Sequence, residues 1–252
     1  SPWMFRCLVD DRGQGRALAN LIFKKLNYKN VGLVIHKNRY GKMGGKEISA
    51  IAKAQGTPLV FKEEFTSAQK EFGKIIRTIR RSRVDAIVIW GLYGPAGRLV
   101  RALGKQRVNV QIFGSDGIVA PAFVDVAGPA SNGAIVTYPY DETRDEAMNR
   151  AFIKRYRRRY NEDPDSFSAH GYDAMVLMCS AIRKAGLNRY RIRDTLANTK
   201  DFPGVTGRIT FDHQGNDTRN VTFALIEKGR FRPLRERDFR KFRQGDKRRA
   251  SR

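Results

Sequence analysis

The sequence predicts an α/β fold in which a parallel open sheet carries helices on both faces. Three observations predict it. Through the first 140 residues, segments with helical apolar spacing alternate with short apolar runs. These runs are apolar throughout rather than at every second position, which is typical of strands buried on both faces. The chain has 252 residues and 41% hydrophobic content, enough for one large domain or two of ordinary size.

The elements of this region are expected to follow one another as helix and strand. Residues 17–26 place leucine and isoleucine on one helical stripe, and the next run, "VGLVIH", predicts a buried strand over 31–36. Further helices are expected near 43–55, around 72–79, around 99–103 and at 121–127. Further strands are expected at "PLVFKEEF", "DAIVIW", "VQIF" and "GAIVTYP".

After Tyr140 the alternation stops. Three helices are expected at about 145–160, 168–185 and 189–198, with no strand between them. Their apolar stripes, such as the one with Phe152, must be buried against another surface, and no sheet for them is evident in this chain.

Two late strand-like runs, "GRITF" and "NVTFALI", are joined by "DHQGNDTR". The joining segment lacks the alternating acidic spacing and the final glutamate of a calcium loop. It is therefore interpreted as the turn of a hairpin between the two runs, with Gly215 and Asn216 supplying positive φ.

The net charge of +24 is the strongest anomaly of the composition, because such a surface attracts nucleic acid or anionic lipid at low salt. Residues 229–252 hold 11 Lys and Arg against 3 Asp and Glu, a net +8, and this region is interpreted as a solvated extension. Much of the rest lies in segments such as "RTIRRSR" and "KRYRRRY", typical of wet helix faces. We therefore expect no specific nucleic-acid binding.

The sequence shows no segment for membrane insertion or export. No run approaches the roughly 20 apolar residues of a membrane span, and the first residues lack the apolar core of a signal peptide. Cys7 and Cys179 are far apart, so neither their number nor their spacing argues for a disulfide.

Candidate binding residues follow three of the predicted strands. Tyr40 comes after "VGLVIH", Tyr93 after "DAIVIW" and Asp116 after "VQIF". Ligands of open parallel sheets bind at the carboxyl ends of the strands, where these turns emerge. Two aromatic rings and a carboxylate suit a small ligand with an ammonium group and an apolar body. The alternative is structural: a tyrosine can pack over a helix N-terminus, and an aspartate can cap a turn.

Catalytic signatures are not found. The sequence has no phosphate loop, no dinucleotide fingerprint, no H-E-x-x-H and no nucleophile elbow. His36, His170 and His213 have no cysteine or acidic residue at metal-ligand spacing and are interpreted as surface or packing residues. We expect no enzyme, no cofactor and no metal.

Five segments resemble the branched-chain amino-acid binding proteins of ABC transporters, the leucine/isoleucine/valine type of periplasmic receptor. They are "YGKMGGKEISAIAKAQG", "DAIVIWGLYGPAGRLVRALGKQRVNVQIFGSDGI", "FVDVAGPASNGAIVTYPY", "FIKRYRRRYNEDPDSFSAHGYDAM" and "FPGVTGRITFDHQGND", in the family's order. The resemblance covers about residues 3–234. It implies a type I periplasmic binding fold, a clamp of two lobes that delivers an amino acid to a membrane permease, and a periplasmic or extracellular location.

The resemblance also implies site residues. Tyr40 matches the family's aromatic in the "YG" turn, and Asp116 matches the acidic residue that pairs with the ligand's α-ammonium. The next contact position falls on Leu92 when counted from the strand, with Tyr93 displaced by one residue, so both are candidates. Phe167 falls where many members have a ligand-contacting tyrosine, and its hydroxyl is missing here.

Family members begin with a further segment that builds most of the first lobe. The resemblance implies that this chain starts after that segment. The expected divisions are a complete lobe over 8–140, helices of the truncated lobe over 141–203, a late hairpin and interlobe crossing over 204–234, and a disordered basic tail over 235–252. One lobe alone leaves the ligand's carboxylate facing water, so weak or no binding is expected from this chain. The alternatives are a ligand-sensing module of the same fold and a charge-driven nucleic-acid binder.

Overall fold

The computed structural model describes residues 2–243, which belong to two compact units. The first, here called the sheet unit, comprises Asp11–Tyr138 and Thr222–Arg252. The second, called the helical unit, comprises Ser1–Asp10 and Pro139–Val221. None of the described helices is long and apolar enough to cross a membrane.

The sheet unit is built on a seven-stranded sheet in the order β2-β1-β3-β4-β5-β8-β9. The first five strands of this order are parallel, and β8 and β9 each pair antiparallel with the preceding strand. The predicted α/β class with a parallel open sheet is confirmed. The strands are β1 (Val31–His36), β2 (Lys62–Phe65), β3 (Ala86–Trp90), β4 (Gln111–Gly114), β5 (Ile135–Thr137), β8 (Phe223–Glu227) and β9 (Arg230–Pro233).

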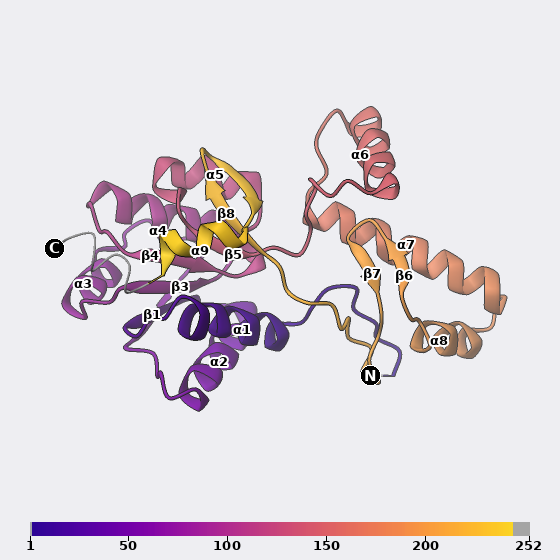
Figure 1. The fold of residues 1–252 in the computed structure, drawn as a ribbon, viewed down its shortest axis with the longest axis horizontal. Coiled ribbons are helices and arrows are strands. Elements are labelled where there is room, and N and C mark those ends of the chain that lie inside the picture. Colours follow the sequence, from indigo (N-terminus) through magenta and orange to yellow (C-terminus); the bar gives the residue numbers. More distant parts are fainter. Residues whose placement is uncertain (1, 244–252) are drawn as a thin grey trace. The chain divides into compact units, whose positions relative to one another are not determined.

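Helices cover both faces of this sheet (Figure 1). One face packs against α1 (Asp11–Ala19), the π-helical η1 (Asn20–Lys25) and α2 (Arg39–Ala54). The other packs against α3 (Gly73–Arg81), α4 (Tyr93–Lys105) and α5 (Pro121–Ala127). Two short 3-10 turns, η2 (Asp116–Ile118) and η3 (Gly128–Ser131), complete the connections.

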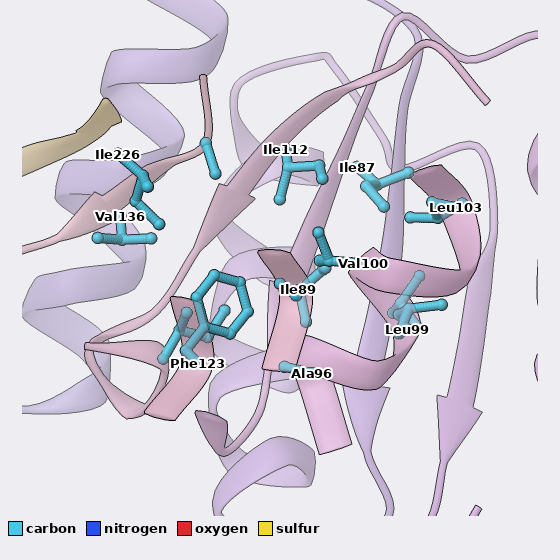
Figure 2. Close-up of a cluster of buried hydrophobic side chains, with 14 of the residues drawn as sticks. Ile87, Ile89, Ala96, Leu99, Val100, Leu103, Ile112, Phe123, Val136 and Ile226 are labelled. Atoms are coloured by element: carbon cyan, nitrogen blue, oxygen red, sulfur yellow. The ribbon is translucent and has the colours of Figure 1, made fainter. Parts of the chain in front are cut away.

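Alternation along the central strands creates the two cores. Leu33 and Ile35 belong to the core under α1 and α2, whereas Val34 between them belongs to the opposite core. All six residues of β1 and all five of β3 are buried, as expected for strands covered on both sides. Figure 2 shows the second core, where side chains of the sheet meet those of α4 and α5. Its labelled members are Ile87, Ile89, Ala96, Leu99, Val100, Leu103, Ile112, Phe123, Val136 and Ile226.

The basic segment 235–252 was expected to be disordered, but its first part forms helix α9 (Glu236–Phe242). Phe239 and Phe242, three residues apart on one helical face, pack against the core under α1 and α2. Two aromatic side chains on one face therefore outweigh the charge of the segment. The rest of the predicted tail, 244–252, lies outside the described residues.

Asp238 anchors α9. Its side chain is 2% exposed and accepts two hydrogen bonds from Arg232 of β9, at 2.7 and 3.0 Å, and one from the Arg235 backbone at 2.9 Å. The hydrogen bonds from Arg232, foremost, lower the pKa of Asp238 from 3.8 to about 2. A carboxyl with a lowered pKa stabilises the fold above its unfolded-state pKa and loses this contribution as pH falls through the folded value.

We expect Asp238→Asn to lower the free energy of unfolding above about pH 4, and this difference from wild type to shrink as pH falls toward about 2. Urea unfolding of both proteins at several pH values measures it. Glu236→Gln is the control, because Glu236 is exposed and forms one surface ion pair with Lys25. A difference between wild type and Asp238→Asn that stays constant down to pH 2 would contradict the assignment.

The helical unit contains α6 (Ala147–Tyr160), α7 (Ser166–Ala185) and α8 (Arg189–Ala197), followed by the two-stranded sheet β6 (Phe202–Gly204) and β7 (Gly207–Ile209). The three expected helices are present. Their apolar stripes are partly covered by this small sheet, since Leu177 and Leu196 pack with Ile209 of β7. Other apolar side chains of α7 are exposed, among them Met175 and Met178.

The predicted turn after "GRITF" is present and is closed by an antiparallel bridge between Phe211 and Asp217, but the predicted pairing of "GRITF" with "NVTFALI" is wrong. The turn exists, because Asp212 N donates to Asn216 O and Gly215 adopts a φ of 76°. However, β7 pairs with β6, and β8 pairs with β5 and β9 of the larger sheet. In the larger sheet Ala224, Leu225 and Ile226 are all buried, whereas an isolated hairpin buries side chains on one face only. Asn216 is also not among the residues with positive φ.

Candidate functional site

The carboxyl ends of β1 and β4 bring Tyr40 and Asp116 into direct contact. Tyr40 lies in the first turn of α2, immediately after β1, and Asp116 opens the 3-10 turn that follows β4. The Tyr40 hydroxyl donates to Asp116 Oδ1 at 2.5 Å. Burial, foremost, and the neighbouring carboxylate raise the pKa of Tyr40 well above 10. The phenol therefore stays protonated and donates a hydrogen bond to the carboxylate.

The turn that carries Tyr40 is held by His36, the last residue of β1. Asn38 caps α2 by accepting from Gly41 N at 2.8 Å, and its amide nitrogen lies 3.1 Å from His36 Nδ1. An amide nitrogen only donates, so Nδ1 accepts, and Nε2 donates to the Ser67 hydroxyl at 2.8 Å. Burial, foremost, lowers the pKa of His36, which agrees with this neutral ring. His36 is thus a packing residue, as the sequence indicated.

Asp116 is half-buried, and its second oxygen is also held. Gln14 Nε2 of α1 donates to Asp116 Oδ2 at 2.9 Å. Gly117 N donates to the Tyr40 hydroxyl at 3.2 Å, so the tyrosine both accepts from this turn and donates into it. The carboxylate is therefore fixed at both oxygens by neutral donors.

Leu92 and Tyr93 lie at the next turn of the same edge. Leu92 precedes α4, Tyr93 is its first residue, and the two are 39% and 40% exposed. A Cβ atom at Gly117 would lie 2.7 Å from Gly91 O and 2.8 Å from the Tyr40 ring. Glycine at this position therefore lets the turns after β1, β3 and β4 approach one another. Both Leu92 and Tyr93 remain candidates for contact with the side of a ligand.

Phe167 belongs to the helical unit. It is the second residue of α7 and is 63% exposed. Of the five candidate residues, the structure thus gathers Tyr40, Leu92, Tyr93 and Asp116 at one edge of the sheet unit. Phe167 stays a prediction from resemblance.

Sequence reasoning missed Gln14 and Thr137. Thr137, the last residue of β5, donates through its hydroxyl to Gln14 Oε1 at 2.7 Å. Both side chains are almost completely buried, at 3% and 1% exposure. The available signals were weak: a glutamine between two glycines in "RGQGR" and a single hydroxyl in the apolar run "GAIVTYP".

The edge offers a fixed carboxylate beside aromatic and aliphatic side chains, which is chemistry for binding a cation with an apolar body. Over residues 2–243, no group of three or more His, Cys, Asp or Glu side chains is arranged to hold a metal ion.

The chain as a whole is similar to proteins of one family. A family model described as periplasmic binding protein matches residues 1–230. The leucine-, isoleucine-, valine-, threonine- and alanine-binding protein of Pseudomonas aeruginosa is 26% identical over 227 residues, which cover 89% of this chain and 60% of that protein. The Leu/Ile/Val-binding protein homolog 1 of Brucella melitensis is 25% identical over 213 residues, 84% of this chain and 57% of that protein. The chain thus spans less than two thirds of the length of these relatives.

Solved structures are also similar to this chain. The branched-chain amino acid transporter substrate binding protein of Streptococcus pneumoniae, in complex with isoleucine, superposes with a TM-score of 0.81 at 28% identity, covering 92% of this chain and 68% of that one. A leucine binding protein from Thermotoga maritima gives a TM-score of 0.86, with coverage of 93% and 67%, and at 24% identity it supports the fold alone. Because the family model matches nearly the whole chain and these structures share its architecture, the chain belongs to the periplasmic binding protein family and has its type I fold.

Proposed function

We propose that this protein is the solute-binding component of an ABC uptake system, which binds a branched-chain or similar amino acid and delivers it to a membrane permease. The observation that carries the proposal is the carboxylate of Asp116, held by Tyr40 and Gln14 at the carboxyl edge of the sheet. The names of the relatives, which bind leucine, isoleucine and valine, support the same class of ligand. The protein acts without catalysis, in the periplasm or outside the cell.

The way Asp116 is held favours an ammonium ligand. Its partners are a phenol and an amide, both uncharged, and no ion pair found between described side chains includes Asp116. The carboxylate is thus oriented without being neutralised, so its charge is available to an α-ammonium group. A hydrogen bond to a charged partner contributes about 1.5–3 kcal/mol, enough to select an amine over an analogue without one. Leu92 and Tyr93 supply apolar surface for the ligand's side chain.

A titration with paired ligands tests this function. Leucine, isoleucine and valine, each up to millimolar concentration, are compared with 4-methylpentanoate, which is leucine without its amine. In ¹⁵N-resolved NMR spectra we expect the amino acids to shift the backbone signals of Tyr40 and Gly117, and the deaminated acid to shift them far less. One lobe alone leaves the ligand's carboxylate facing water, so the binding expected here is weak, and millimolar ligand is used to detect it. Equal responses to leucine and 4-methylpentanoate, or no response to any amino acid even at millimolar concentration, would refute the proposal.

A further inference from the structure

A buried amide connects two strands of the sheet to the candidate site. Gln14 lies in α1, its side chain is almost completely inaccessible, and its two terminal atoms reach different elements. Nε2 donates to Asp116 after β4, and Oε1 accepts from Thr137 at the end of β5. All three residues belong to the sheet unit.

The chemistry of the three groups allows only one orientation of the amide. A carboxylate can only accept hydrogen bonds, so Gln14 must present its NH₂ group to Asp116. Its carbonyl oxygen then faces Thr137, whose hydroxyl has to donate. The carboxylate therefore determines which end of the amide it meets, and the Thr137 hydroxyl holds the opposite end.

We propose that Gln14, held in place by Thr137, is a positioning residue that sets the direction of the Asp116 carboxylate for its ligand. The proposal rests on the proposed function, in which Asp116 receives an ammonium group. An amide suits this role because it holds an oxygen without adding charge, whereas lysine or arginine at position 14 would form an ion pair with Asp116 and compete with the ligand. Burial of the glutamine keeps water from replacing its hydrogen bond.

The first test needs no ligand. In the full chain, the side-chain NH₂ of Gln14 is identified by its loss in Gln14→Leu, and its exchange with water is measured by NMR. We expect slow exchange in wild type, at least 10-fold faster exchange in Thr137→Val, which keeps the shape but removes the hydroxyl, and recovery in Thr137→Ser. Free exchange in wild type, or no effect of Thr137→Val, overturns the inference.

The second test is a double-mutant cycle on ligand affinity. We expect Gln14→Leu to weaken leucine binding about 2- to 10-fold, the range for one lost hydrogen bond, and to leave 4-methylpentanoate unchanged. In the Asp116→Asn background, the same change should have no further effect. Gln55→Leu is the matched control: it removes an amide hydrogen bond to Asn20 elsewhere in the sheet unit and should leave leucine affinity intact.

The two tests distinguish a failure of the positioning role from a failure of the proposed function. Losses that add independently in the cycle overturn the positioning role while leaving amino-acid binding in place. If wild type binds no amino acid, the proposed function fails. The exchange measurement then still decides whether Thr137 and Gln14 hold the carboxylate.

Discussion

Replacing Asp173 by asparagine is expected to lower the stability of the helical unit by about 3 kcal/mol, because it breaks a buried charged network. Asp173 lies in α7 and is 1% exposed. One of its oxygens accepts from Val205 N at 2.7 Å, and the other accepts from Thr206 N at 2.9 Å and from the Thr206 hydroxyl at 2.6 Å. This carboxylate therefore fixes the turn between β6 and β7 onto the helix.

An asparagine of the same shape cannot replace it. Whichever way the new amide points, its NH₂ group faces a backbone N–H, from Val205 or from Thr206. The Thr206 hydroxyl cannot easily reverse its role, since it already accepts from Arg219 at 2.8 Å. Arg219 in turn binds Asp217 and the backbone oxygen of Cys7, so the disturbance spreads to the N-terminal segment of the unit.

The helical unit has little apolar packing to offset this loss. Among the residues that the structure describes, its two apolar clusters are small, with five and four buried residues, against 23 and 18 in the clusters of the sheet unit. A loss of about 3 kcal/mol should lower the urea midpoint of the helical unit by about 1–3 M, given typical slopes of about 1–3 kcal/mol per M for small proteins.

The two tryptophans allow each unit to be followed separately. Trp3 lies in the helical unit and Trp90 in the core of the sheet unit, so their indole NMR signals report the two transitions. Asp173→Asn should move the Trp3 transition and leave that of Trp90 nearly unchanged. Asp145→Asn is the control in the same unit: its side chain is 89% exposed, in a surface ion pair with Arg150, and its removal should cost less than about 1 kcal/mol. Equal effects of the two substitutions would show that the network contributes no special stability.

The local sequence pattern was sufficient to predict elements that are buried on both faces or that pair with elements close in sequence. "VGLVIH" and "DAIVIW" are apolar at every position, and they form the central strands β1 and β3. The pairing of "NVTFALI" was mispredicted because a strand's partner is set by the whole sheet: β8 pairs with β5, nearly 90 residues away, rather than with the nearby β7. Helix α9 was missed for a related reason, since the contacts of Phe239 with the core outweigh the charge that dominates its sequence.

The candidate site likewise contains residues that could be predicted from the sequence and residues that could not. Tyr40 and Asp116 could be found because the carboxyl ends of parallel strands meet at one edge, and the structure places them in contact. Gln14 and Thr137 could not be found, because no motif links residues 123 positions apart and neither follows a strand into a turn at this edge. Their role depends on burial and hydrogen-bond direction, which a single sequence does not display.

Asp116→Asn is expected to weaken binding of leucine by about 10- to 100-fold, the loss of one hydrogen bond between charged partners. The substitution removes the charge that an α-ammonium requires. It also places an NH₂ group against a donor on at least one side, because the carboxylate now accepts from both Tyr40 and Gln14. Calorimetric or NMR titration measures the loss, with 4-methylpentanoate as the ligand that should be little affected.

Asp125→Asn provides the matched control for this experiment. Asp125 is exposed on α5 of the same unit, so its substitution changes the net charge of the protein by the same amount. With a net charge of +24, a general electrostatic effect on a small ligand would appear in both variants. A loss confined to Asp116→Asn assigns the ammonium to this carboxylate, whereas similar losses in the two variants would mean that the overall charge, and not the geometry of the edge, governs binding.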